Sequence, residues 1–214
     1  GKVIPALLAG CTVVLKPAPD TPVTAAFMGE LALEAGFPAG VFNVVSSADP
    51  VMAGETLVTD PRVDVISFTG STGVGKRIME KGAATLKRVF LELGGKSANI
   101  ILDDASDFAM SVMQSIVIFH AGQGCAIPTR LFVPRSRYEE ALKALEMAYA
   151  GFATKWGDFD DPTQVMGPVI SARQRDRVME YIALGQKEGA RLLTGGKART
   201  DKGGGFFIEP TCFV

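Results

Sequence analysis

Short apolar runs alternate with longer segments of helical spacing along the first part of the chain. The runs are rich in β-branched residues and predict strands over 11–16, 41–45, 63–68 and 87–93. The segments between them predict helices over 22–35, 50–59 and 71–85. Pro22 suits the first position of a helix, and Gly36 suits the position after its end. This alternation is typical of an α/β fold with a mainly parallel sheet.

A second set of elements follows the glycine pair Gly94-Gly95. We expect strands over 98–102, 129–133, 191–194 and 206–208, with a Gly/Lys-rich hairpin between the last two. We expect helices over 106–119, 136–151 and 171–188, the last with Ser171 as its N-cap, and an exposed, turn-rich loop over 158–168. The glycine pair therefore divides the chain into two predicted domains, residues 1–94 and 95–214.

Both ends of the sequence resemble the interior of a longer chain. Residues 2–10 (KVIPALLAG) begin within an apolar helical pattern that has no capping residue before it. Residues 207–214 (FIEPTCFV) end within a strand-like run that has no stop signal after it. We therefore expect both domains to be incomplete and the chain to be a fragment.

Composition excludes several classes of function. A content of 47% hydrophobic and 21% charged residues allows a substantial core, and a net charge of −1 gives no reason to expect nucleic acid or a membrane as partner. The sequence has three cysteines without CxxC spacing and one histidine, so no metal site is expected. An odd number of cysteines suits a reducing compartment, and we expect a cytoplasmic protein.

The segment FTGSTGVGK (68–76) follows a predicted strand and opens a predicted helix, where free backbone N–H groups can bind phosphate. One interpretation is a dinucleotide turn in which Gly70 and Gly75 leave room for a pyrophosphate. The other is a P-loop, GxxxxGK[ST], to which Gly70, Gly75 and Lys76 conform. Arg77 stands where the magnesium-binding hydroxyl of a P-loop is needed, which weighs against that interpretation.

Two residues are candidates for covalent chemistry. Cys125 lies among small residues, which predicts an exposed thiol, whereas Cys11 and Cys212 lie in strand-like apolar runs that predict inert core cysteines. Glu92 has apolar neighbours on both sides, which predicts partial burial and suits a general base. His120 is predicted to end an apolar helix, where a capping or packing role is favoured over a dyad with Cys125.

Four segments together resemble the aldehyde dehydrogenase superfamily, which uses NAD or NADP. They are TVVLKPAPDTP (12–22), FTGSTGVGK (68–76), LELGGK (91–96) and GQGC (122–125). The resemblance covers almost the whole chain and implies a Rossmann-like parallel sheet in a cofactor domain joined to an α/β catalytic domain. Softer matches at 166–178 and 204–211 extend it toward the end of the sequence.

The resemblance also implies roles for individual residues. Cys125 would attack a small-molecule aldehyde, a hydride would pass to the nicotinamide, and Glu92 would activate the water that releases a carboxylic acid. Lys16 would bind ribose, but Pro19 stands where many members have a glutamate, so NAD and NADP both remain open. The implied cofactor-binding residues are Lys16, Gly70, Ser71, Thr72, Gly75, Leu93, Gly94 and Gln174.

Several alternatives remain open beside this interpretation. The full-length enzyme would form a homo-oligomer, whereas the fragment alone is expected to be inactive because the family's oxyanion asparagine lies outside it. A non-catalytic remnant would keep the motifs without turnover. A CoA-acylating relative would transfer the thioester to CoA, and a P-loop hydrolase would be indifferent to loss of Cys125.

Overall fold

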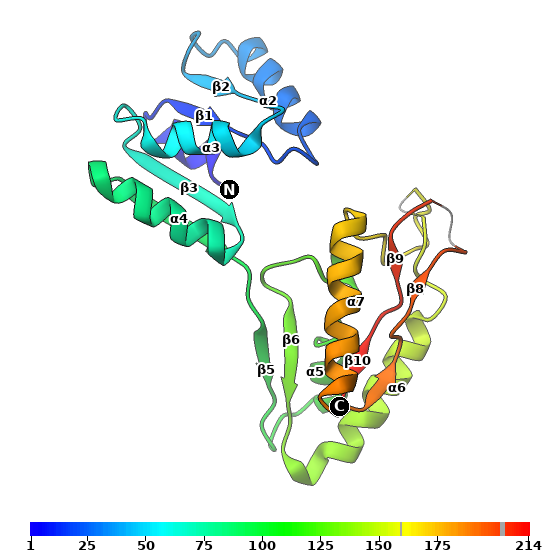
Figure 1. Cartoon of the computed structure of the whole chain (residues 1–214). Coiled ribbons are helices and arrows are strands. Elements are labelled where there is room, and N and C mark those ends of the chain that lie inside the picture. Colours follow the sequence, from blue (N-terminus) through cyan, green and yellow to red (C-terminus); the bar gives the residue numbers. More distant parts are fainter. Residues whose placement is uncertain (159, 202–203) are drawn as a thin grey trace. The chain divides into compact units, whose positions relative to one another are not determined.

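A computed structural model of the chain describes residues 1–158, 160–201 and 204–214. Helices and strands alternate through the first half of the chain and both are present in the second half, which confirms the predicted α/β class (Figure 1). The chain divides into two compact units, Gly1–Gly94 and Gly95–Val214.

The first unit contains four helices and four strands. They are α1 (Val3–Leu8), β1 (Val13–Leu15), α2 (Val23–Glu34), β2 (Phe42–Val44), α3 (Pro50–Thr59), β3 (Val65–Gly70), α4 (Thr72–Gly82) and β4 (Arg88–Leu93), with a short 3-10 turn at Ala83–Thr85. The strands form two hydrogen-bonded parallel pairs, β1 with β2 and β3 with β4. All of the strands and helices predicted for this unit are present, with ends displaced by a few residues at most.

Local signals explain two of these helices. Pro50 opens α3 and has no N–H to satisfy, and the Asp49 carboxylate accepts the N–H groups of the next two residues, Val51 and Met52, so the first turn of the helix is capped. Ser71 caps α4 in the same way by accepting the N–H of Val74 at 3.4 Å. Few side chains of this unit are buried, among them Val58 and Ile78.

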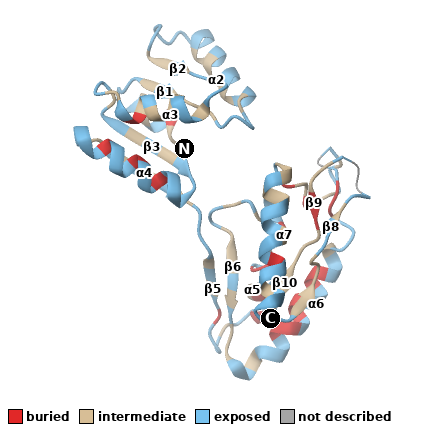
Figure 2. Cartoon of the chain, in the orientation of Figure 1, coloured by how far each residue is buried: buried red, intermediate tan, exposed pale blue. Residues whose placement is uncertain are grey.

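The second unit holds the larger core and a more varied set of strands. Its elements are β5 (Ser97–Ile100), α5 (Phe108–Met113), a 3-10 segment (Phe119–Gly122), β6 (Pro128–Phe132), a 3-10 turn (Arg135–Arg137), α6 (Tyr138–Phe152), α7 (Ala172–Lys187), β7 (Leu192–Thr194), β8 (Ala198–Arg199), β9 (Phe207–Ile208) and β10 (Cys212–Phe213). Strands β5 and β6 are parallel, whereas β7 with β10 and β8 with β9 are antiparallel pairs. Figure 2 shows buried residues gathered along one face of α6.

The predicted helix over 106–119 is wrong in its second half. Helix α5 ends at Met113, and the chain then turns so that both Ile116 and Ile118 enter the core. The Asn99 side chain of β5 donates to the Ser111 carbonyl and to the Ser115 hydroxyl, both at 2.8 Å. This long-range bond fixes the turn, and an apolar pattern read locally does not reveal it.

Two other expectations for this unit change. The 158–168 segment, in which residue 159 lies outside the described residues, is not wholly exposed, because Met166 is buried and pairs with Trp156. The predicted strands over 191–194 and 206–208 are present but do not pair with each other, since β7 pairs with β10 and β9 with β8. Residues 202 and 203, within the predicted hairpin, lie outside the described residues.

None of the helices described here is both long enough and apolar enough to cross a membrane. Within 1–158, 160–201 and 204–214, no group of three or more His, Cys, Asp or Glu side chains could hold a metal ion.

Candidate active site

The glycine turn of the first unit joins β3 to α4. Strand β3 ends at Gly70, and the Ser71 cap leaves the start of an 11-residue helix with an exposed backbone. Thr72 is the first residue of α4 and is also exposed. A capped, open helix N-terminus that follows a parallel strand is suited to bind phosphate oxygens through backbone N–H groups.

Gly75 has a packing role within this turn and helix. It is buried, and a Cβ at this position would lie 2.9 Å from Cδ2 of Leu93 and 3.5 Å from Cδ1 of Leu91. The glycine therefore allows α4 to lie directly against β4. Gly70 differs, because it is exposed and a Cβ there would meet the ring of Phe68 at 2.5 Å.

The surroundings of Arg77 bear on the P-loop interpretation. Its Nε donates to Oε1 of Glu55 at 2.5 Å, and this hydrogen bond lowers the pKa of the Glu55 carboxyl. Residue 77 is thus engaged in a surface ion pair with α3, at the position where a P-loop places a metal-binding hydroxyl. This ion pair counts against the P-loop interpretation.

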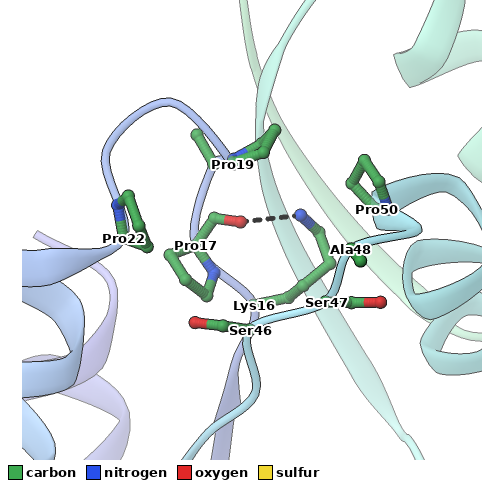
Figure 3. A pocket seen from close by; sticks show the side chains of 9 residues that line it. Lys16, Pro17, Pro19, Pro22, Ser46, Ser47, Ala48 and Pro50 are labelled. Carbon is green, nitrogen blue, oxygen red and sulfur yellow. Dashed lines mark hydrogen bonds between the residues drawn. The ribbon is translucent and has the colours of Figure 1, made fainter.

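A second feature of this unit is a cavity of about 380 Å³ at the ends of β1 and β2. It is lined by Lys16, Pro17, Ala18, Pro19, Pro22, Ser46, Ser47, Ala48 and Pro50 (Figure 3). The half-buried Lys16 directs its ammonium group to the Pro17 carbonyl at 2.8 Å. None of the lining residues is acidic, so the cavity carries a cation and two hydroxyls and is suited to a sugar hydroxyl or a phosphate.

Glu92 is exposed within its unit, so the expected partial burial is wrong there. Side chains of β4 alternate between exposed and half-buried, and Glu92 shares the exposed face with Phe90. Leu93, the next residue, points to the opposite face and packs against Gly75, and Gly94 ends the unit in an exposed position. The apolar neighbours in the sequence face α4 and leave the carboxylate uncovered.

Cys125 occupies a turn in the second unit. The turn runs from Gly124 to Ile127, closed by a 3.4 Å hydrogen bond from the Ile127 N–H to the Gly124 carbonyl, and Cys125 is its first central residue. The cysteine is exposed, as its small neighbours predict. An exposed thiol on a short turn is accessible to an electrophile.

The other two cysteines differ from each other. Cys212 is half-buried beside Tyr149, and burial raises the pKa of its thiol, in keeping with an inert cysteine. Cys11 is exposed, so its predicted place in the core is wrong. Strand β1 begins only at Val13, which leaves Cys11 outside the strand.

The residues before Cys125 have an unusual backbone. His120, Ala121 and Gly122 all have positive φ angles, of 51°, 52° and 73°. Each non-glycine residue in this conformation costs about 1–2 kcal/mol, so neighbouring contacts must hold it. His120 is exposed and does not end a helix as predicted, because α5 ends at Met113.

Gln123 provides such a contact, and the sequence alone did not single it out. Its Nε2 donates to the His120 carbonyl at 2.9 Å, and its Oε1 accepts the Ile170 N–H at 3.0 Å. The second bond joins residues 47 positions apart and ends two residues before α7. Gln174, the other candidate of this unit, lies in the first turn of that helix, where its N–H donates to the Ser171 hydroxyl at 3.3 Å.

The structure therefore presents the candidate residues as two groups. The first unit holds Glu92 and most of the candidate cofactor-binding residues, which are Lys16, Gly70, Ser71, Thr72, Gly75, Leu93 and Gly94. The second unit holds Cys125 and Gln174. The Gln123 side chain, two residues before Cys125, is hydrogen-bonded to the segment before α7.

Known proteins resemble this chain over its whole length. A family model described as "Aldehyde dehydrogenase family" matches residues 1–214. Retinal dehydrogenase 2 of Mus musculus is 47% identical over 215 residues, which cover 99% of this chain and 40% of that protein. The chain spans about 40% of the length of the curated relatives it matches.

Solved structures of aldehyde dehydrogenases also resemble this chain over almost its whole length. An aldehyde dehydrogenase of Mycobacterium tuberculosis complexed with NAD+ superposes with a TM-score of 0.91 at 46% identity, over 99% of this chain and 43% of that one. A mutant of aldehyde dehydrogenase C from Pseudomonas syringae, complexed with NAD+ and octanal, superposes with a TM-score of 0.91 at 39% identity, over 99% of this chain and 44% of that one.

Proposed function

The chain belongs to the aldehyde dehydrogenase family, and on this basis we propose that it carries the cofactor-binding and thiol-bearing parts of an enzyme that oxidises an aldehyde to a carboxylic acid with NAD(P). The observation that carries the proposal is the exposed Cys125 thiol on the Gly124–Ile127 turn. Of the exposed cysteines, it is the one that lies in the GQGC segment, and Cys11 lies outside any comparable turn motif.

The residues of the first unit fit a dinucleotide. The open N-terminus of α4 at Ser71 and Thr72 would bind the pyrophosphate, which would also lie beside the exposed Gly70. Lys16 and the hydroxyls of Ser46 and Ser47 would bind the ribose that carries the adenine. Gly75 and Leu93 would contribute by holding α4 against β4. Gly94 is proposed as a further cofactor contact, and Gln174 as a contact on the nicotinamide side.

The Lys16 cavity leaves the choice between NAD and NADP open. A carboxylate would favour two free ribose hydroxyls and repel a 2′-phosphate, and no lining residue of this cavity supplies one. Pro19 lines it instead, and the adjacent Asp20 is not among the lining residues. The cavity is therefore compatible with either cofactor.

The chemistry assigned to the second unit is covalent. The Cys125 thiolate would attack the carbonyl carbon of an aldehyde and form a tetrahedral thiohemiacetal. A bound nicotinamide dinucleotide supplies the two-electron acceptor by which the carbon is oxidised to the thioester level. Glu92 would then take a proton from water as that water adds to the thioester, so that a carboxylic acid leaves and the thiol is restored.

The first test compares the two exposed cysteines in the full gene product that contains this sequence. Aldehyde-dependent formation of NADH or NADPH is expected to disappear in Cys125→Ala and to persist in the matched control Cys11→Ala. Equal loss or equal retention in the two variants would contradict the assignment of Cys125. Addition of CoA distinguishes the CoA-acylating alternative, since that relative would form an acyl-CoA in place of the free acid.

A second variant addresses the general base. In Glu92→Gln, the thioester on Cys125 should still form but should hydrolyse more slowly, by about 10²-fold or more. Mass spectrometry of protein quenched after aldehyde addition would detect the accumulated acyl group. If no acyl group accumulates while turnover falls, Glu92 acts at an earlier step than the one proposed.

A further inference from the structure

The turn that carries Cys125 depends on a backbone conformation that L-residues rarely adopt. Three successive residues, His120, Ala121 and Gly122, have left-handed φ angles. Ala121 is held by packing, because it contacts both hydrophobic clusters of the second unit, the one around Val112 and the one around Ile182. The backbone of His120 has no such packing of its own, since this residue is exposed.

The side chain of Gln123 forms the next support. Its amide joins the His120 carbonyl, at 2.9 Å, to the Ile170 N–H, at 3.0 Å, and we call these two bonds the Gln123 bridge. The backbone N–H of Gln123 also donates to the His120 carbonyl at 3.0 Å. Both functional groups of the Gln123 amide are therefore hydrogen-bonded, one to the backbone at His120 and the other to the backbone at Ile170.

The far end of the bridge is fixed in turn. Val169, next to Ile170, is buried and donates its N–H to the Phe206 carbonyl at 3.0 Å. On the other side, Ser171 caps α7 through the N–H of Gln174. The Ile170 N–H is thus presented from a segment anchored to both the core and a helix, and it can hold the turn of Cys125 in place.

We propose that Gln123 is a positioning residue for the Cys125 thiol, acting through the Gln123 bridge. The inference rests on the proposed function and deepens it. Loss of the bridge would free the left-handed run to relax toward ordinary backbone angles, which would displace the turn two residues later. A nucleophile displaced by about 1 Å loses on the order of 10²-fold in rate, because the reacting atoms no longer meet in the required geometry.

The test compares Gln123→Met, Gln123→Glu and the control Gln164→Met in the full gene product. Methionine keeps the length of the side chain and removes both bonds, whereas glutamate keeps the acceptor for the Ile170 N–H and removes the donor. Gln164 is a matched control, because its amide donates to Asp161 and Thr163 of its own loop.

We expect Gln123→Met to lower kcat by about 10²-fold when kcat is expressed per mole of Cys125 that can be alkylated. KM for aldehyde and the affinity for nucleotide should change by less than about threefold. Gln123→Glu should have a smaller effect, and Gln164→Met should leave kcat unchanged. In hydrogen exchange, the Ile170 amide should exchange faster in Gln123→Met and at the wild-type rate in Gln164→Met. A purely structural role would lower the folded fraction without changing kcat per titrated thiol.

Failure of the positioning role can be distinguished from failure of the proposed function. If the wild-type protein oxidises aldehyde and Gln123→Met keeps kcat within about twofold, the positioning role is wrong and the proposed function stands. Unchanged exchange at Ile170 in Gln123→Met would likewise overturn the bridge. If the wild-type protein itself oxidises no aldehyde with either dinucleotide, the proposed function fails and the positioning role fails with it.

Discussion

A Cβ on Gly75 would lie 2.9 Å from Cδ2 of Leu93, so helix α4 rests on strand β4 through a residue that has no side chain. This contact joins two parts of the candidate site. Gly75 belongs to the helix whose N-terminus follows the glycine turn, and Leu93 directly follows Glu92. How closely α4 approaches β4 therefore sets the position of the glycine turn relative to the end of β4.

Gly75→Ala should test this contact. The added methyl group must displace the ends of Leu93 and Leu91, which costs about 1–3 kcal/mol, and the higher helix propensity of alanine offsets about 1 kcal/mol of that. We expect a net destabilisation of about 1 kcal/mol and weaker dinucleotide binding. Gly73→Ala in the same helix is the control, because a Cβ there meets nothing within 4 Å, and it should stabilise the protein slightly. Urea unfolding and nucleotide titration of both variants provide the measurement.

Lys16→Met should alter cofactor selectivity. Lys16 is proposed to bind the adenine-side ribose, so its loss should weaken both dinucleotides, and affinity for NADP+ should fall further, by about tenfold, because the ammonium group also forms a charge-assisted contact with the 2′-phosphate. Lys2→Met is a suitable control, because Lys2 bonds to Ser67 and does not line the cavity. Calorimetric titration with both dinucleotides gives the comparison. Equal loss for the two cofactors would mean that Lys16 binds a group they share.

The three cysteines should differ in reactivity. Cys125 and Cys11 are exposed, whereas Cys212 is half-buried and burial raises the pKa of its thiol. Near neutral pH, iodoacetamide should therefore modify Cys125 and Cys11 well before Cys212, since the thiolate is the reacting form. Peptide mass spectrometry at several times would measure the order. In urea the three rates should converge, and a Cys212 that reacts as fast as Cys11 in the folded protein would contradict the burial.

Alkaline pH should destabilise the second unit. Burial raises the pKa of the Tyr149 phenol above its ordinary value of 10.0 and that of the Cys212 thiol above 9.0. Above about pH 9 the unfolded chain ionises these groups while the folded chain keeps their protons, so the unfolded state binds fewer protons and the free energy of unfolding falls. The decrease should reach as much as about 1.4 kcal/mol per pH unit for each group.

Tyr149→Phe separates the phenol from the thiol. This substitution keeps the ring in the core and removes one ionising group, so the loss of stability above about pH 10 should become shallower. Urea unfolding at about pH 8 and about pH 11, for both proteins, measures the difference. Identical pH dependence in the two proteins would mean that the phenol ionises equally well in the folded state.

Elements with local signals were predictable from the sequence. Helix α3 has the predicted limits, Pro50 to Thr59, because a capping aspartate and a proline mark its start. Helix α7 begins after Ser171, as expected from the same kind of signal. The exposure of Cys125 also followed from its small neighbours, which cannot cover a thiol.

Features that depend on distant partners were not predictable. The end of α5 is set by Asn99, which lies on another element, and no local residue marks it. The exposure of Glu92 follows from which face of β4 receives α4, whereas its apolar neighbours suggested burial. Gln123 attracts attention only once Ile170, 47 positions away, is seen to donate to it.

The parallel register of β3 and β4 also limits how the length of this region can vary among natural relatives. The two strands pair without a shift from Val65 with Arg88 to Gly70 with Leu93, which places Thr69 beside Glu92. Because successive side chains alternate between faces, a single inserted or deleted residue within β4 would carry the carboxylate to the face covered by α4. Insertions and deletions should therefore gather at the exposed Leu86, before the strand begins.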